Sequence, residues 1–253
     1  MSPDNSYHAA KVSTAGITSF SLKIIAIIAM TMNHTANIFY DVLPFPALCV
    51  LYGAGGFTFP IMAFLLVVGY LHTSNVKKYA LRLGLFALVA QVPYGLFLSP
   101  MGNVLITLLI SLGILYADDH VKNRVVFWIL FTVAIIGSLT CDWGFIGVIM
   151  VYLFKVLRGQ RGAVMAPVGI AIAALGIPTL GSLITEVITV NDWYYLPQAL
   201  YPFIGCTFTI PLLSNYQGAR GKPLKWFFYA YYPAHIAVLG MTYLFIFGQM
   251  PQF

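Results

Sequence analysis

The sequence predicts an all-α polytopic membrane protein with about nine transmembrane helices. Hydrophobic residues make up 60% of the 253 positions and charged residues only 8%, whereas about a quarter of the residues in a soluble domain are charged. The apolar residues gather in a succession of long runs, and about 20 such residues are needed for a helix to cross a membrane. Lys and Arg, finally, lie between alternate runs. No stretch is left for a separate soluble enzyme domain.

Nine apolar runs qualify as spans, of which the fourth to sixth are short. The second is interrupted by Gly53-Ala54-Gly55-Gly56, which indicates a break in that helix. The first 21 residues lack the pattern of a signal peptide, so we expect a cytoplasmic tail over 1–21, one transmembrane domain over 22–247 and a short tail over 248–253. The expected spans are 22–40, 47–71, 79–98, 103–117, 125–140, 144–157, 164–188, 196–214 and 226–247.

Charge placement orients these spans, because cytoplasmic loops carry the Lys and Arg of a membrane protein. On this map all 13 basic residues fall on one side, and the opposite loops hold acids. The basic residues are Lys11, Lys23, Lys77, Lys78, Arg82, Lys122, Arg124, Lys155, Arg158, Arg161, Arg220, Lys222 and Lys225, and the acids are Asp41, Asp142, Glu186 and Asp192. The map therefore places the N-terminus in the cytoplasm and the C-terminus outside.

The same placement explains the formal net charge of +6. A nucleic-acid site needs a basic face with stacking or base-reading groups, whereas these residues are scattered over five short segments. No nucleic-acid partner is expected. Cys49, Cys141 and Cys206 lack metal-type spacing, and no metal site is predicted.

Polar side chains within the first span form the leading candidate for a functional site. Asn33, His34 and Asn37 interrupt an otherwise apolar helix, and spacings of three and four residues place Asn37 on a face with the other two. Buried ionisable groups in membranes usually face the bundle interior and mark function. An imidazole suits proton transfer near neutral pH. The alternative is a packing histidine that bonds a neighbouring helix.

A second histidine, His235, is expected at a similar depth in the last span, so the two rings can meet. Pro233 lies two residues before it and can kink that helix. The alternative is that the nearby tyrosines form an aromatic belt while His235 bonds the kinked backbone. Among the other polar groups, Gln91 and Asn103 are expected to bond neighbouring helices. Asp142 is expected to cap the helix that follows it from an outer loop.

Several segments, taken in order, resemble the TraX family, named for the F-pilin acetylase of conjugation systems and related to the transmembrane acyltransferase superfamily. The resemblance spans most of the chain. It rests on LKIIA (22–26) leading to His34, FPIMAFLL (59–66), GYLHT (69–73), NVKKY (75–79) before LRL (81–83), QVP (91–93), NVL (103–105), DWG (142–144) and FYAYYPAH (228–235).

The chain departs from the family pattern at two positions. The family usually has Asp-His where this chain has Asn33-His34, and Gly-Arg where it has Gly55-Gly56. Both departures remove a charge. Because a single unpaired buried charge is heavily penalised, we infer from the sequence that the absent acid and base faced each other. On that basis, Asn33→Asp with Gly56→Arg should fold better than either single variant.

The resemblance implies a bacterial inner-membrane, multi-pass acetyltransferase that takes acetyl from acetyl-CoA and passes it to an amine or hydroxyl. The acceptor is a peptide or pilin N-terminus, a glycan or a small molecule. His34 would be the general base, with His235 also required and Asn33 and Asn37 orienting His34 or steadying the oxyanion. An acetyl-histidine intermediate is the alternative chemistry. Lys77, Lys78 and Arg82 would bind the acetyl-CoA polyanion. The oligomeric state stays open.

Two other classes of protein fit the same pattern. A secondary transporter also uses broken helices and midplane polar groups, but it usually has internal repeats, and none is visible here. A non-catalytic membrane assembly factor of a conjugation or secretion system fits the two lost charges, and it predicts that His34→Ala is silent.

Overall fold

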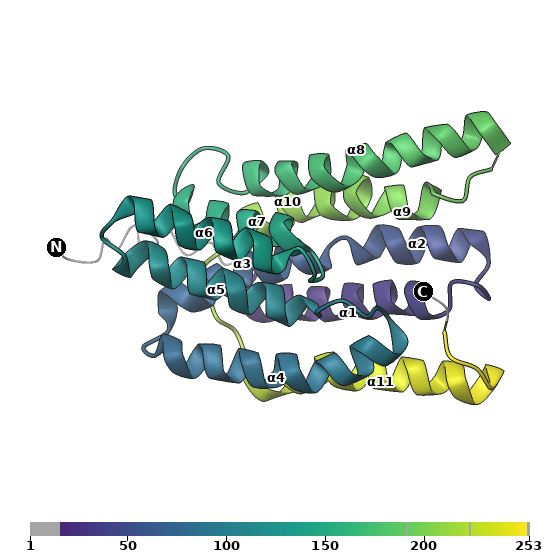
Figure 1. Ribbon diagram of the computed structural model, residues 1–253, viewed down its shortest axis with the longest axis horizontal. Helices are drawn as coiled ribbons and strands as arrows, with labels where there is room; N and C mark the ends of the chain where they lie inside the picture. The colour runs from purple at the N-terminus through teal and green to yellow at the C-terminus, as the bar shows by residue number, and fades with distance from the viewer. Residues whose placement is uncertain (1–15, 191, 223, 252–253) are drawn as a thin grey trace.

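The computed structural model describes residues 16–190, 192–222 and 224–251, and that part of the chain is helical without strands (Figure 1). The helices run back and forth along the long axis of the molecule. They are α1 (Ser19–Ile38), α2 (Phe45–Gly55), α3 (Thr58–His72), α4 (Val76–Phe97), α5 (Val104–His120), α6 (Arg124–Ser138), α7 (Gly144–Val156), α8 (Met165–Val190), α9 (Leu196–Leu200), the π-helix η1 (Tyr201–Cys206), α10 (Thr207–Ser214) and α11 (Lys225–Phe247).

Two rods of this bundle are broken helices. The rod Phe45–His72 breaks between α2 and α3 at the glycine run, as the sequence predicted, and the rod Leu196–Ser214 contains η1. The two breaks pack on each other through glycine. A Cβ added at Gly56 would lie 2.1 Å from the carbonyl oxygen of Tyr201, and one added at Gly205 would lie 2.4 Å from the Cα of Gly56. Both positions therefore require glycine for the backbones to approach this closely.

Five rods are long and apolar enough to cross a membrane, within the described residues. They are Phe45–His72, Val76–Phe97, Met165–Val190, Leu196–Ser214 and Trp226–Phe247. The helices α6 and α7 are apolar but shorter, with 15 and 13 residues. Exposed apolar side chains such as Val133 and Phe245 give the bundle the exterior expected of a protein in lipid.

The helix limits lie within three residues of the expected spans. α1 begins at Ser19, inside the segment expected as a tail over 1–21. Residues 1–15 with Lys11, and 252–253 of the C-terminal tail, fall outside the described residues. The core between the rods is built from large side chains that are almost fully enclosed, among them Leu22, Phe59, Leu115 and Tyr243.

We call the end that holds the start of α1 and the α3–α4 loop the basic end, and the end that holds Asp41 and Asp192 the acidic end. At the basic end the ammonium group of Lys155 lies 3.0 Å from the Asp118 carboxylate and 2.5 Å from that of Asp119. These ion pairs join α5 and α7.

The loop between α6 and α7 lies partway along the bundle, because these two helices stop short of the acidic end that α1, α8 and α11 reach (Figure 1). It pairs with the loop before α5: the Gly102 amide donates to Thr140 and the Asp142 amide to Gly102, at 2.9 and 2.7 Å. The Thr107 hydroxyl donates to the Asp142 carbonyl. Asp142 therefore lies within the bundle. The expectation that its side chain caps α7 is wrong, because the N-cap is Trp143 and no side chain makes a capping bond.

Candidate functional site

Two buried histidines form the centre of the candidate site. His34 on α1 and His235 on α11 are each 7% exposed, and their rings stack with centroids 4.9 Å apart. His34 Nδ1 lies 2.7 Å from His235 Nε2. This confirms the expectation that the rings can meet. His34 stands about 22 Å along α1 from Ser19, and His235 about 15 Å along α11 from Lys225.

The hydrogen bonds of the pair define its protonation pattern. His235 Nδ1 lies 2.8 Å from the carbonyl oxygen of Tyr231, so Nδ1 must carry a proton in order to donate. In a neutral ring His235 Nε2 is then an acceptor, and His34 Nδ1 must donate to it. His34 Nε2 is left with an unshared electron pair, and it has no hydrogen-bond partner in the described part of the chain. This nitrogen is the free base of the site.

The two asparagines beside His34 bond each other and not the imidazole. The Asn37 amide nitrogen donates to the Asn33 backbone and side-chain oxygens at 2.8 and 3.2 Å. The Tyr52 hydroxyl donates to the Asn37 side-chain oxygen at 2.9 Å. In this structure His34 is oriented by its own bond to His235, and the expected roles of Asn33 and Asn37 in orienting His34 or steadying an oxyanion stay predictions. Asn33 and Asn37 form part of a cavity wall.

A cavity of about 370 Å³ reaches His34 from the acidic half of the bundle. Besides Asn33, Asn37 and Tyr52, it is lined by Tyr94, Asp142, Trp143, Gln198 and Tyr201. Asp142 is the only acid in this lining, which contains no Lys or Arg. Sequence reasoning missed Asp142 as a site residue. The signal was the shortness of the two spans that flank it, since short spans place their connecting loop inside the bundle.

Local backbone geometry fixes Asp142 at the wall of this cavity. The next residue, Trp143, has the left-handed φ of 61°, and Gly144 follows with φ of 36°. A left-handed conformation is unfavourable for a bulky residue. Packing holds it in place, because the Trp143 ring stacks on Phe59 with centroids 4.2 Å apart. Strain of this kind is typical of functional sites.

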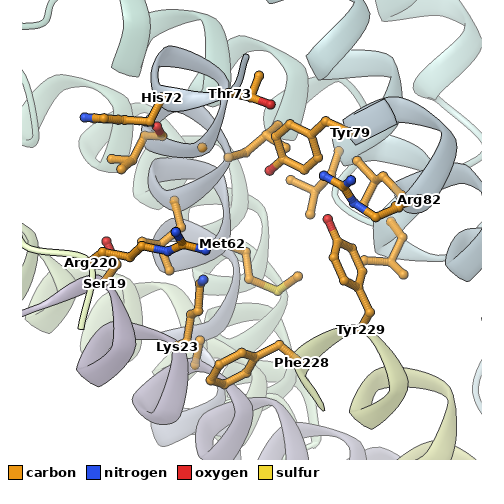
Figure 2. Close-up of a pocket in the computed structure, with 18 of the residues that line it drawn as sticks. Ser19, Lys23, Met62, His72, Thr73, Tyr79, Arg82, Arg220, Phe228 and Tyr229 are labelled. Atoms are coloured by element: carbon orange, nitrogen blue, oxygen red, sulfur yellow. Dashed lines mark hydrogen bonds between the residues drawn. The ribbon is translucent and has the colours of Figure 1, made fainter. Parts of the chain in front are cut away.

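A larger cavity of about 690 Å³ opens at the basic end, within the range of about 300–1,000 Å³ typical of small-molecule sites. Figure 2 shows Arg82, Tyr79 and Tyr229 on one side of it and Arg220 and Lys23 on the other. Of the three residues expected to bind a cofactor, Lys78 and Arg82 line this cavity and Lys77 does not. Lys23 and Arg220 were not singled out from the sequence.

Arg82 presents an open donor at this cavity. Its Nε atom is buried and has no hydrogen-bond partner among the described residues. A buried polar atom without a partner is costly, so this atom is a candidate contact for a bound anion. Within the described residues no cluster of His, Cys, Asp and Glu could hold a metal ion.

The two family departures do not face each other. An added Cβ at Gly55 would lie 2.7 Å from the Asn33 Cβ, whereas an added Cβ at Gly56 meets the backbone of Tyr201 and Gly205. Position 56 points at η1. The inference that an acid at 33 and a base at 56 formed a pair is therefore wrong for this geometry.

Comparison with known proteins gives two matches and one absence. The model of the TraX protein family matches residues 19–243. A probable fimbrial assembly protein, FimC of serogroup H1 from Dichelobacter nodosus, is 28% identical over 247 residues, which cover 90% of this chain and 97% of the relative. No solved structure matches this chain.

Proposed function

The chain belongs to the TraX family, and on that premise we propose that it is an integral-membrane acyltransferase that moves acetyl from acetyl-CoA to an amine or hydroxyl acceptor. The observation that carries the proposal is the free Nε2 of His34. This base lies in the wall of one cavity and contacts Tyr232, which lines the other. Acyl transfer brings a donor and an acceptor together at one base, and the two cavities give each of them a route to His34.

In the proposal the protein crosses the bacterial inner membrane nine times, with the N-terminus and the basic end in the cytoplasm. The membrane topology follows from the excess of Lys and Arg at that end. The large cavity then opens to the compartment that contains acetyl-CoA. Lys23, Lys78, Arg82 and Arg220 supply positive charge for its phosphate groups, and Arg is suited to bidentate phosphate contacts.

The chemistry assigns one role to each member of the histidine pair. His34 Nε2 removes the proton from the acceptor amine or hydroxyl as that atom attacks the thioester carbonyl. The carbon–sulfur bond then breaks, the new carbon–nitrogen or carbon–oxygen bond remains, and the proton passes from His34 to the leaving thiolate. His235 holds His34 in the tautomer that leaves Nε2 unprotonated.

The proposal is tested first on the donor side, which needs no knowledge of the natural acceptor. Acetyl-CoA binding to the purified protein in nanodiscs is measured by calorimetry for wild type, Lys78→Gln and Arg82→Gln. Lys122→Gln is the matched control, because Lys122 is exposed outside the cavity. Loss of one charge-assisted bond, about 1.5–3 kcal/mol, should weaken binding by about tenfold or more in the two cavity variants alone.

Turnover is then followed as release of CoA thiol with ethanolamine as the probe acceptor, because this molecule offers both an amine and a hydroxyl. Mass spectrometry of the product identifies the acetylated atom. His34→Ala should bind acetyl-CoA normally and release no CoA. No binding at millimolar acetyl-CoA, or normal turnover by His34→Ala, would contradict the proposal.

The name of the fimbrial relative favours a second candidate, a membrane assembly factor without catalysis. In that case the histidine pair only joins α1 to α11. A cell that depends on this protein for surface-fibre assembly would then tolerate His34→Gln, provided that the variant reaches the membrane in normal amounts. The acyltransferase proposal requires the same variant to fail.

A further inference from the structure

One tyrosine, Tyr232, lines the large cavity and contacts His34, which lines the small one. It stands three residues before His235 on α11, so both side chains share one face of that helix. The Tyr232 ring meets the His34 ring edge to face, with centroids 6.1 Å apart, and lies 5.8 Å from the His235 ring. Tyr232 is thus in contact with both members of the histidine pair.

Tyr232 connects the two cavities through His34. Tyr232 lines the large cavity at the basic end. Its ring also contacts the ring of His34, which lines the small cavity. The Tyr232 side chain therefore belongs to the wall between the cavity proposed for the donor and the one proposed for the acceptor.

The hydroxyl of this wall residue lacks a bond of its own. Tyr232 is 2% exposed, and its oxygen has no hydrogen-bond partner in the described part of the chain. A buried hydroxyl is normally satisfied, and phenylalanine would fill the same space without an unsatisfied group. The open hydrogen bond points to a group that arrives with a ligand.

We propose that the Tyr232 hydroxyl donates a hydrogen bond to the carbonyl oxygen of the acyl donor and to the oxyanion that forms from it. This inference rests on the proposed acyltransferase function. When the acceptor attacks, the carbonyl electron pair moves onto oxygen, and it returns when the carbon–sulfur bond breaks. Tyr232 keeps its proton throughout. A fixed donor at this oxygen stabilises the transition state more than the bound thioester.

Two measurements on Tyr232→Phe test the inference in nanodiscs. The turnover number for CoA release with ethanolamine should fall by about 100-fold or more, the loss seen when one oxyanion donor is removed. The dissociation constant of acetyl-CoA should stay within about twofold. In infrared difference spectra with carbonyl-13C acetyl-CoA, the bound carbonyl band should shift to higher frequency in the variant, because a hydrogen bond to the oxygen is lost.

Tyr243→Phe is the matched control. Tyr243 is on the same helix, is also 2% exposed and lines neither cavity, so its variant should keep the turnover number and the carbonyl band of wild type. If the wild-type protein is active but Tyr232→Phe keeps the wild-type turnover number, or keeps the wild-type carbonyl band, this inference is overturned and the proposed function stands. No His34-dependent turnover by the wild-type protein would remove the proposed function and this inference with it.

Discussion

Replacing His235 separates a positioning role from a catalytic one. In His235→Phe the Nδ1 of His34 loses its acceptor at 2.7 Å. The pair is almost fully enclosed, so water does not replace the lost bond. His235→Gln differs, because the side-chain oxygen of Gln can accept a hydrogen bond in place of the imidazole Nε2.

The structure sets the size of the effect. Leaving a buried donor unsatisfied costs about 1–3 kcal/mol, and His34 can avoid this cost by moving its proton from Nδ1 to Nε2. In the resulting tautomer Nε2 carries the proton and can no longer act as the base. With about 1.4 kcal/mol for each factor of ten, the turnover number of His235→Phe should fall by about 5- to 150-fold, while His34→Ala should abolish turnover.

The assay is CoA release with ethanolamine in nanodiscs, with thermal unfolding measured in parallel. His235→Gln should recover most of the turnover number that His235→Phe loses, and both variants should bind acetyl-CoA as wild type does. The reasoning would be refuted by equal inactivity of His235→Gln and His235→Phe in folded protein, because His235 would then have to exchange a proton itself. A fully active His235→Phe would refute it as well.

Two further changes test the packing and the small cavity. Gly56→Ala should lower the free energy of unfolding by about 1–3 kcal/mol through overpacking, since its Cβ would lie 2.1 Å from a backbone oxygen of η1. Gly113→Ala is the control, because the space around its Cβ is open. It should be neutral or stabilising in the same thermal unfolding series. Asp142→Asn should raise the KM for ethanolamine about tenfold without changing the dissociation constant of acetyl-CoA, because Asp142 lines the small cavity and not the large one. Asp192→Asn is the control, because Asp192 is exposed. A variant in which only the dissociation constant of acetyl-CoA changes would contradict the assignment.

Helix positions and the meeting of His34 with His235 were predictable from sequence because both depend on counting residues along a span. The break at the glycine run and the bonds of Gln91 were predictable in the same way: its side chain accepts from the Asn103 amide and donates to Met101, both at 2.9 Å. These features are local, or follow from helix rise.

What could not be predicted depends on three-dimensional convergence. The positive-inside rule places all basic residues at one end and does not distinguish between them. Nothing in the sequence therefore showed that Lys78 lines the large cavity and that Lys77 does not. Lys23 and Arg220 come from opposite ends of the chain and meet at that cavity only in the fold (Figure 2). Asp142 was assigned to an outer loop because the two spans that flank it were assumed to cross the whole membrane.

The family departures lead to a last prediction, which reverses the one drawn from sequence. Asn33 bonds Asn37, and His34 is oriented by the bond that it donates to His235, so the missing acid at 33 leaves the histidine pair intact. An arginine at 56 has no space beside η1, because its Cβ would meet the backbone of Tyr201 and Gly205. Asn33→Asp with Gly56→Arg should therefore unfold at a lower temperature than Asn33→Asp alone. A more stable double variant would mean that α2 and η1 move apart enough for the two charges to pair.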